Sequence, residues 1–244
     1  MSNGSDPIEQ HEVYLECEKR WVFALLMMVG GYFGGFTYSI RGGVFCNAQT
    51  ANIVLLSLAV GNGNWSKALY YLIPISAYLI GVILSESAAY YIKRLHLIRW
   101  DTLFILLEMI AVIILALLPE TAPYQITQVT INFICAMQFN TFRQAEGIPM
   151  ATTFCTNHIR QIGIAASKLM RHHGGDAYLE RMFFHLRMIG LFSLGVLSAT
   201  LLSRVFLGRA LLFALIPLCI VLADFLYADL KVEHGSFEPK PHGH

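Results

Sequence analysis

The hydrophobic positions of this chain fall into long apolar runs that are separated by short polar segments. A helix needs about 20 mostly apolar residues to cross the hydrocarbon core of a bilayer. Six runs come close to this length or exceed it: Trp21–Ile40, Ala68–Ile92, Thr102–Leu118, Gln125–Phe142, Met182–Ser203 and Ala210–Ala228. Two further apolar runs, Asn47–Val60 and Met150–Leu169, are shorter and more polar. The pattern predicts an all-α polytopic membrane protein.

The order of these runs occurs twice along the chain. Each half has a long run, a short run and two further long runs, and aligning Thr50 with Thr156 sets an offset of 106 residues. We therefore expect two membrane repeats. The predicted parts are an N-terminal tail (1–20), repeat 1 (21–118), an external loop (119–123), repeat 2 (124–230) and a C-terminal tail (231–244).

The distribution of positive charge predicts how the runs are threaded through the membrane, because loops with excess Lys and Arg remain in the cytoplasm. Two loops are marked in this way, one by Lys93, Arg94 and Arg99 and the other by Lys168, Arg171 and Arg181. The loop at 119–123 carries neither residue type. Two apolar runs lie between this external loop and the second cytoplasmic loop, so we expect one to cross fully and the other to be re-entrant.

The same argument makes Asn47–Val60 re-entrant from the outside. The predicted fold therefore has six transmembrane helices plus two re-entrant half-helices in an inverted 3+3 repeat. Both termini are expected in the cytoplasm, and the chain in the bacterial plasma (inner) membrane. Inverted repeats of this kind are typical of transporters, whose sites lie near mid-membrane at the repeat interface.

Composition agrees with a membrane protein and narrows the functional classes. The chain is 56% hydrophobic and 14% charged, whereas soluble domains carry about 25% charged residues. The net charge of +1 offers no basic field for nucleic acid. The five cysteines are scattered, and we find no catalytic triad order, phosphate-binding loop or zinc motif. We expect no enzymatic activity, no cofactor, no metal and no signal peptide.

The two short runs are the first candidates for a solute site, since non-helical backbone at membrane depth is tolerated only where it is buried in protein or lines a watery cavity. The free amides of a helix start attract anionic or polar groups. The candidate substrate-binding residues are Asn47, Gln49, Thr50 and Asn52 in the first run and Thr153, Thr156, Asn157 and His158 in the second, with Thr152 beside them. The alternative is that these side chains only satisfy the backbone of two buried helix starts.

Four charged residues lie in or beside the predicted spans, namely Arg41, Glu86, Glu108 and Arg143. An ionisable group inside a membrane is costly and is therefore a functional candidate. The arginines occupy matching ends of the first span in each half, where they serve either an anionic solute or the bracing of a loop. The two glutamates suit a proton-coupled carrier, and the alternative is that they fix helix packing.

Gly30, Gly31, Gly34 and Gly35 form two overlapping GxxxG patterns in the first span. Small residues allow the backbones of two membrane helices to approach closely. We expect this surface to pack against the neighbouring half-helix.

Two stretches resemble the signatures of a known family. The stretch GGYFGGFTYSIRGGVFCNAQTANIVLL is similar to the first signature of the YoaK family, small bacterial six-helix membrane proteins of unknown function, and ICAMQFNTFRQAEGIPMATTFCTNHIR is similar to the second. Where the family shows Thr-Gly-Asn, this chain has Thr50-Ala51-Asn52 and Thr156-Asn157-His158, and Gly34-Gly35 replaces an Asp of the first span. The resemblance implies a membrane location and a duplicated architecture, but it does not identify a substrate.

The pattern as a whole favours a small-solute transporter or channel, with its path between the two half-helices. The expected partners are the lipid bilayer and an anionic or polar neutral solute, and the oligomeric state is open. The alternative function is that of a non-transporting membrane sensor or assembly partner.

Overall fold

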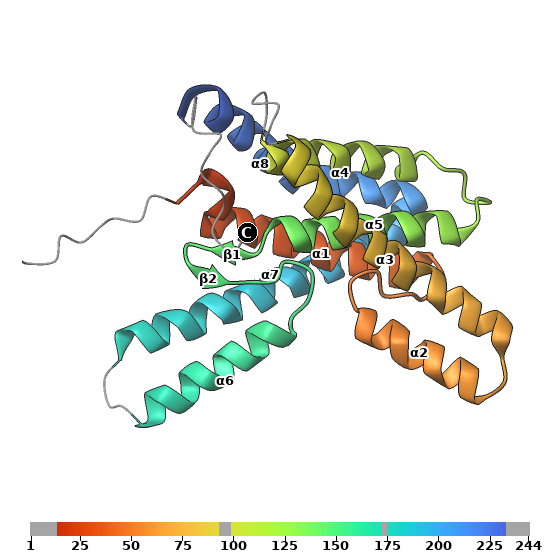
Figure 1. Ribbon diagram of the computed structural model, residues 1–244, viewed down its shortest axis with the longest axis horizontal. Coiled ribbons are helices and arrows are strands. Elements are labelled where there is room, and N and C mark those ends of the chain that lie inside the picture. The colour runs from red at the N-terminus through yellow and green to blue at the C-terminus, as the bar shows by residue number, and fades with distance from the viewer. Residues whose placement is uncertain (1–13, 93–98, 172–174, 233–244) are drawn as a thin grey trace, which may run out of the picture.

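The computed structural model describes residues 14–92, 99–171 and 175–232, and its fold is almost entirely helical (Figure 1). In chain order the elements are the 3-10 helix η1 (Glu16–Glu18), α1 (Arg20–Ile40), α2 (Gln49–Gly61), α3 (Trp65–Ile92), α4 (Trp100–Ala116), α5 (Tyr124–Thr141), the strands β1 (Gln144–Ala145) and β2 (Ile148–Pro149), α6 (Thr156–Arg171), α7 (Asp176–Phe206), the 3-10 helix η3 (Leu207–Ala214), α8 (Leu215–Tyr227) and the π-turn η4 (Ala228–Val232). The predicted charges Lys93 and Arg94, and most of both predicted tails, lie outside the described residues.

The predicted long runs correspond to helices, although α7 (Asp176–Phe206) begins well before the predicted Met182 and the last run differs in form. The run predicted over Ala210–Ala228 begins as η3 and becomes α-helical only at Leu215. Pro217 explains this difference, because proline has no N–H for the carbonyl four residues earlier and its ring clashes with that carbonyl. The chain around Phe213 therefore adopts the tighter 3-10 form.

The two short runs begin later than predicted. The first forms α2 from Gln49, and the second forms α6 only from Thr156. Residues 150–155 are a non-helical segment that follows the β1–β2 hairpin, whose strands pair Gln144 with Pro149 and Ala145 with Ile148. The hairpin was not predicted.

The helices pack in a pattern that is the same for the two halves. α1 packs along α7 and α3 packs along α5, while α2 lies against α3 and α6 lies against α7. α4 packs against α8 in the upper part of the view in Figure 1. The main helix contacts of the first half therefore have counterparts in the second half.

Ion pairs and hydrogen bonds show which helix ends lie together. At one end of the molecule, Arg20 at the start of α1 pairs with Glu146 after β1 and with Glu180 near the start of α7, at 2.9 and 3.0 Å. At the other end, Arg41 after α1 and Gly208 after α7 both bind Glu120 after α4. α1 and α7 therefore run in the same direction.

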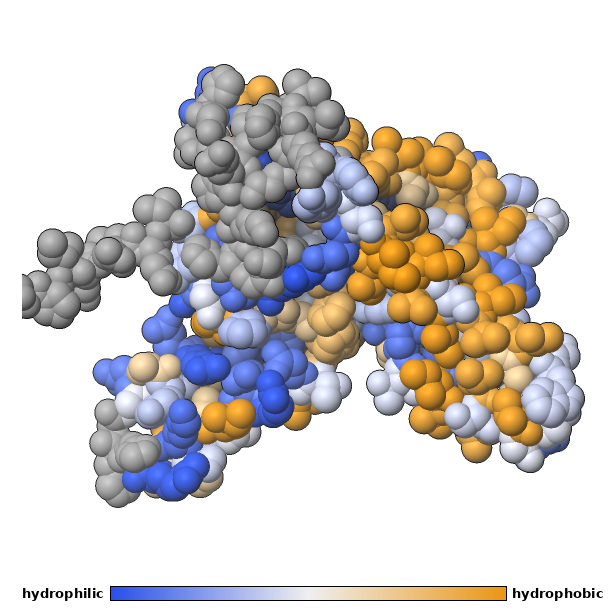
Figure 2. All heavy atoms as spheres, in the orientation of Figure 1, coloured by the Kyte–Doolittle hydropathy of each residue, from blue (hydrophilic) through white to orange (hydrophobic). Residues whose placement is uncertain are grey.

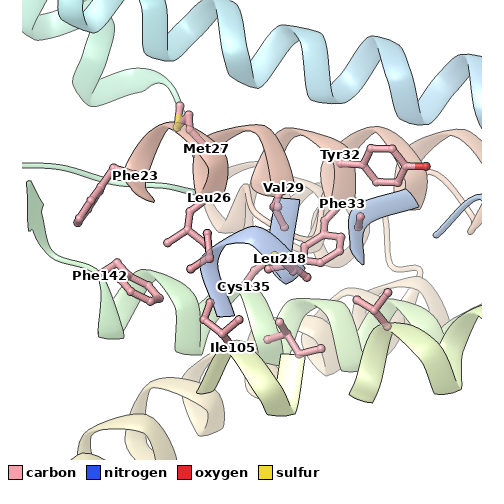
Figure 3. Packing of buried hydrophobic residues seen from close by; sticks show 14 of the residues in the cluster. Phe23, Leu26, Met27, Val29, Tyr32, Phe33, Ile105, Cys135, Phe142 and Leu218 are labelled. Carbon is pink, nitrogen blue, oxygen red and sulfur yellow. The ribbon is translucent and has the colours of Figure 1, made fainter. Parts of the chain in front are cut away.

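The hydrophobic core surrounds α1 (Figure 3). Phe23, Leu26 and Phe33 of this helix are fully buried against Ile105 of α4 and Leu218 of α8, among others. Of an apolar 18-residue stretch within each helix, 67% is buried in α1 and 28% in α3. α1 is therefore the central helix, and α3 is a peripheral one.

Much of the outer surface is apolar. Figure 2 shows apolar side chains over α2, α3 and α4, and polar side chains over α6 and the first part of α7. Large apolar residues such as Ile53, Leu58 and Leu79 are at least half exposed, which a water-soluble surface of this extent would not tolerate. The chain is a helical membrane protein.

Three stretches of the described residues are long and apolar enough to cross a membrane, namely Arg20–Ile40, Trp65–Tyr91 and Asp176–Lys231. The last of these doubles back on itself. Gly208 lies beside Arg41 at one end of α1, whereas Glu180 lies beside Arg20 at the other. Asp229, after α8, accepts a hydrogen bond from Thr102 at the start of α4.

Candidate functional site

The four glycines of α1 form two contact surfaces. Gly31 and Gly35 lie against the backbone of α7, where a Cβ at Gly35 would be 2.8 Å from the carbonyl oxygen of Val196. Gly30 and Gly34 face the non-helical segments that precede α2 and α6. The predicted packing against a half-helix is therefore wrong for Gly31 and Gly35, since the long helix α7 takes that position.

We call residues 41–48 the first entry loop and residues 150–155 the second entry loop. Both reach Gly30. Asn47 donates a hydrogen bond from Nδ2 to the carbonyl oxygen of Gly30 at 3.2 Å. A Cβ on Gly30 would lie 2.5 Å from the carbonyl oxygen of Thr152 and 3.2 Å from Cα of Thr153. The absence of a side chain at Gly30 thus lets both loops meet at the middle of α1.

The first entry loop is held by amide side chains. Asn52, in the first turn of α2, donates from Nδ2 to the carbonyl oxygen of Phe45 at 3.0 Å and to Oε1 of Gln49 at 3.1 Å. Gln49 donates to Oδ1 of Asn132 on α5 at 2.7 Å. Asn52 and Asn132 are fully buried. These bonds fix the start of α2 against α5.

The second entry loop contains two buried threonine hydroxyls that do not brace the loop by hydrogen bonds. Thr152 and Thr153 are both completely buried, and neither Oγ1 has a hydrogen-bond partner among the described residues. Buried polar atoms without a partner are rare in native proteins and call for an explanation such as a bound water, ion or ligand. These hydroxyls are therefore the strongest indication of a ligand position.

The two loops overlap when the halves are aligned with the offset of 106. Asn47 aligns with Thr153, and both lie against Gly30. Asn52 aligns with His158, which is also fully buried. Each of these two side chains bonds to a backbone carbonyl seven residues earlier, at 3.0 Å for Asn52 and 3.1 Å for His158. The two different residue types therefore hold equivalent loops.

Three predicted site residues lie outside this buried cluster. Thr50 and Thr156 lie in the first turns of α2 and α6 but are exposed. Asn157 is half-buried and accepts a hydrogen bond at 2.9 Å from Arg160, one turn further along α6. Any role of these side chains in solute binding stays a prediction.

Glu108 lies inside the core of the bundle. Its side chain is fully buried in α4, and neither carboxyl oxygen has a hydrogen-bond partner among the described residues. Cys135 of α5 is an electrostatic neighbour of Glu108, and its Sγ lies 3.9 Å from Sγ of Cys46 in the first entry loop. Glu108 thus lies near the first entry loop.

Arg41 closes the end of the molecule at which α1 and α7 finish. The guanidinium is buried, donates to Glu120 at 2.9 Å and lies over the rings of Phe36 and Tyr124. Glu120 also accepts from the amide of Gly208 at 2.7 Å. Partial burial opposes ionisation of this carboxyl, but the two hydrogen bonds outweigh that effect and lower the pKa of Glu120. Through Glu120, Arg41 therefore holds together the ends of α1, α4 and α7.

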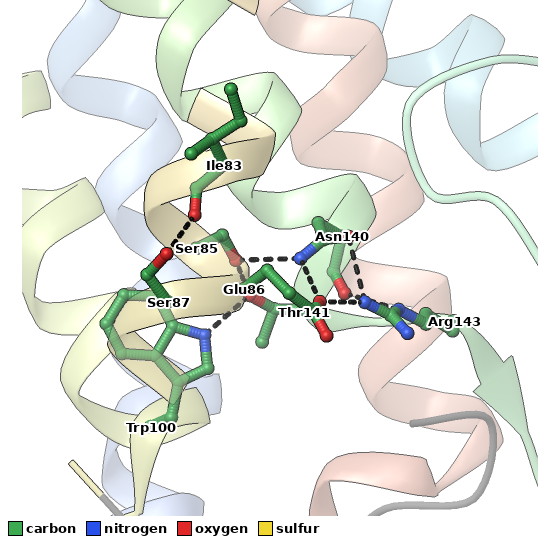
Figure 4. Close-up of polar contacts among 8 residues, drawn as sticks. All are labelled: Ile83, Ser85, Glu86, Ser87, Trp100, Asn140, Thr141 and Arg143. Atoms are coloured by element: carbon green, nitrogen blue, oxygen red, sulfur yellow. Dashed lines mark hydrogen bonds and ion pairs between the residues drawn. The ribbon is translucent and has the colours of Figure 1, made fainter. Parts of the chain in front are cut away.

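Arg143 and Glu86 form a network at the opposite end (Figure 4). Glu86 accepts hydrogen bonds from Arg143 and, at 3.1 Å, from Nδ2 of Asn140. Thr141 next to them accepts a hydrogen bond from the indole of Trp100 at 2.9 Å. Glu86 is largely exposed. The network joins α3, α4 and α5, which agrees with the bracing alternative for Arg143.

Sequence reasoning missed His185 and Asn132. His185 is fully buried on α7, with Nδ1 2.9 Å from Nδ1 of His158. It lies inside a predicted span, where any ionisable residue is a functional candidate, so the signal was present. Asn132 carried a weaker signal, because uncharged amides are common in the contacts between membrane helices.

Comparison with known families identifies the family of this chain. The model of a family described as a protein of unknown function (DUF1275) matches residues 22–223. This is the family of YoaK-like membrane proteins, so the resemblance seen in the two signatures is confirmed. No curated protein and no solved structure gives a significant match to the chain.

Proposed function

The chain belongs to the DUF1275 family, and from its own geometry we propose that it is a transporter of small, uncharged, polar solutes. The proposed central site comprises Gly30, Asn47, Thr152 and Thr153. The observation that carries the proposal is the pair of buried threonine hydroxyls without partners among the described residues, at the point where both entry loops meet α1. Binding and movement of a solute, rather than covalent chemistry, is the activity that this set of groups suits.

The placement of charge favours an uncharged solute over an anion. Arg41 is paired with Glu120 at one end of the molecule, and Arg143 is paired with Glu86 at the other. Neither arginine is available to neutralise an anion at Gly30. The groups around Gly30 are hydroxyls, a carboxamide and backbone carbonyls, which recognise hydroxyl and amide groups of a neutral ligand.

The packing supports the inverted repeat that the proposal requires. Six crossings with alternating direction agree with the positions of Arg20, Glu146 and Glu180 at one end and of Arg41 and Glu120 at the other. In this arrangement α2 and α6 are short re-entrant helices that enter from opposite faces. Figure 1 shows their outer ends diverging from the centre of the molecule. Broken backbone at the middle of an inverted repeat is the usual site of solute binding in transporters.

In this proposal the structure represents an occluded state. The Arg41–Glu120 pair closes the predicted outer end, and Arg20 with Glu146 and Glu180 closes the predicted inner end. A transporter exposes its site to one side at a time. Each set of ion pairs would therefore break in one of the two open states.

A swelling assay tests the proposal directly. Proteoliposomes are mixed with hyperosmotic glycerol, erythritol or urea, and light scattering follows solute entry. We expect entry faster than into empty vesicles for at least one solute. Thr153→Val should reduce that rate about tenfold, because a lost hydrogen bond to the solute costs about 1.4 kcal/mol.

The matched control is Thr130→Val on α5. The hydroxyl of Thr130 is exposed and donates a hydrogen bond within its own helix, to the carbonyl oxygen of Ile126 at 2.8 Å. This variant should transport like the unmodified protein. Entry of all three solutes at the rate of empty vesicles would contradict the proposal and would favour a non-transporting sensor or assembly partner.

A further inference from the structure

We propose that His158 and His185 form a proton relay that leads from the predicted cytoplasmic half of α7 to the central site and couples solute movement to a proton. This inference rests on the proposed function, since it supplies the coupling ion for the same site. It concerns two side chains that the solute-binding argument does not use.

The two rings lie at a helix contact that is closed to solvent. His158 is on α6 and His185 is on α7, and both side chains are fully buried. Their Nδ1 atoms are 2.9 Å apart, and Nε2 of His158 is 3.1 Å from the carbonyl oxygen of Ala151. Nε2 of His185 has no hydrogen-bond partner among the described residues.

These contacts fix the position of each proton. A carbonyl oxygen only accepts, so Nε2 of His158 carries the hydrogen and its Nδ1, in the neutral ring, is a bare acceptor. The hydrogen of the short contact between the rings must then be on Nδ1 of His185. It follows that Nε2 of His185 is a bare nitrogen with a free lone pair. The pair accepts a proton at one defined atom.

The relay moves one proton and no electrons. A proton binds Nε2 of His185, and an N–H bond forms there. The proton shared between the rings passes from Nδ1 of His185 to Nδ1 of His158. The N–H bond at Nε2 of His158 then breaks and releases its proton beside the Ala151–Thr152 peptide, to a water or a solute in the central site. Reorientation of the rings, or passage in the reverse direction, restores the starting tautomers.

The charged groups around the pair favour brief occupancy by the extra proton. Arg181, one turn before His185 on α7, repels positive charge on the His185 ring and donates to Gln161 of α6 at 3.0 Å. From α1, Arg20 lies over the ring of Phe184, and its charge is balanced by Glu146 and Glu180. A positive charge on the histidine pair is therefore unfavourable, so the extra proton is passed on and not retained.

The counterpart of His158 in the first half of the molecule shows that holding the loop does not require a histidine. Asn52 is the counterpart of His158 and holds its own entry loop by the equivalent bond, to a carbonyl seven residues earlier. A carboxamide makes that bond but does not pass a proton through itself under these conditions. Loop bracing therefore requires only an asparagine, and the two histidines of the second half provide an additional property.

The first test reads the tautomers in the unmodified protein. Nitrogen-15 NMR of histidine-labelled protein in lipid nanodiscs, assigned with His158→Asn and His185→Gln, should show a protonated Nε2 for His158 and a bare Nε2 for His185. A nitrogen–nitrogen coupling should join the two Nδ1 atoms. A protonated Nε2 on His185 at neutral pH, or two uncoupled rings, would overturn the relay.

The second test separates coupling from transport. Proteoliposomes containing the pH dye pyranine receive glycerol, erythritol or urea, and both solute entry and internal pH are recorded. We expect solute entry to move protons in the same direction. His185→Gln should retain solute entry, because His185 belongs neither to the central site nor to an entry loop, and should lose the proton signal.

The outcomes distinguish the two proposals. Solute entry without proton movement in the unmodified protein overturns the relay and leaves the transporter intact. Absence of solute entry overturns the transporter, whatever the tautomers are. Loss of both signals in His185→Gln, with folded protein confirmed by gel filtration, assigns the histidine pair to structural support and overturns the relay.

Discussion

Individual buried polar side chains carry most of the functional information in this molecule. Asn47, Asn52 and Thr153 were identified from the sequence and lie in the buried cluster, whereas Thr50 and Thr156 point outward. The reason is helical phase. Beyond its first turn α2 has one polar side chain, Ser57, so its sequence has no amphipathic pattern that would show which of its polar residues faces inward.

The second half did contain such a pattern. His158, Gln161 and Ala165 recur at helical spacing and form the buried face of α6, while Arg160 and Arg171 lie on the exposed face. This pattern was not recognised, because the stretch Met150–Leu169 was interpreted as an apolar run. The helical period of the sequence is by itself enough to separate His158 from Thr156.

At Glu108 we predict that removing the polar group stabilises the fold. Glu108→Met replaces two buried oxygens that have no partner among the described residues by a side chain of similar volume, and each unpartnered polar group costs about 1–3 kcal/mol. The midpoint of thermal unfolding in detergent should therefore rise. Glu86→Met, at an exposed ion pair, is the control and should not raise it. A lower midpoint for Glu108→Met would show that the carboxyl has a stabilising partner.

At the scale of elements, the bilayer made the long helices predictable. The length needed to cross hydrocarbon fixes the span of each run within a few residues, and α1, α3, α4 and α5 begin and end within three residues of their predicted limits.

The β1–β2 hairpin was not predicted, because its strands have two residues each, too few for a periodic pattern. Its turn, Glu146–Gly147, has positive φ at both residues, as a tight hairpin requires.

The contact between α1 and α7 depends on the absence of side chains. A Cβ on Gly195 would meet the backbone of α1, with the amide nitrogen of Tyr32 at 2.8 Å. Gly195→Ala should therefore destabilise the protein by about 1–3 kcal/mol, the usual cost of overpacking. Thermal unfolding in detergent measures this change.

The matched control is Gly190→Ala on the same helix, where a Cβ would meet nothing within 4 Å. It should leave stability unchanged or raise it by about 0.4–1 kcal/mol, because alanine restricts the unfolded chain. Equal effects of the two substitutions would contradict the close packing of α1 on α7.

At the scale of the whole molecule, the two halves are alike in packing and different in surface. α2 exposes Ile53, Val54 and Leu58, whereas α6 exposes Arg160 and Arg171. A surface of the first kind suits lipid, and one of the second kind suits the positively charged cytoplasmic side of the membrane. The halves therefore share their backbone contacts but carry different charges, as expected if the first short helix enters from outside and the second from the cytoplasm.

The outer closure can be tested with a thiol that is already in place. Cys46 is fully buried in the first entry loop, which begins at Arg41, the partner of Glu120. In a protein that keeps only this cysteine, a membrane-impermeant maleimide added outside should react slowly. Glu120→Gln removes the charge that holds Arg41 and the segment at Gly208, so labelling of Cys46 should accelerate severalfold. Glu86→Gln, at the opposite end, is the control and should leave external labelling unchanged.

Low pH should also break the Arg41–Glu120 pair in the protein that keeps Cys46 and has no other substitution beyond the removed cysteines. The pKa of Glu120 in the folded protein is lowered, so its ion pair is present above the ordinary carboxyl range and is lost as the pH falls through that lowered value. External labelling, corrected for the slower intrinsic reaction of thiols in acid with an exposed-cysteine reference, should therefore rise only at low pH. Glu120→Gln should show no such rise. Labelling of Cys46 that is fast from inside and insensitive to Glu120 would place this end of the molecule in the cytoplasm and would overturn the predicted orientation.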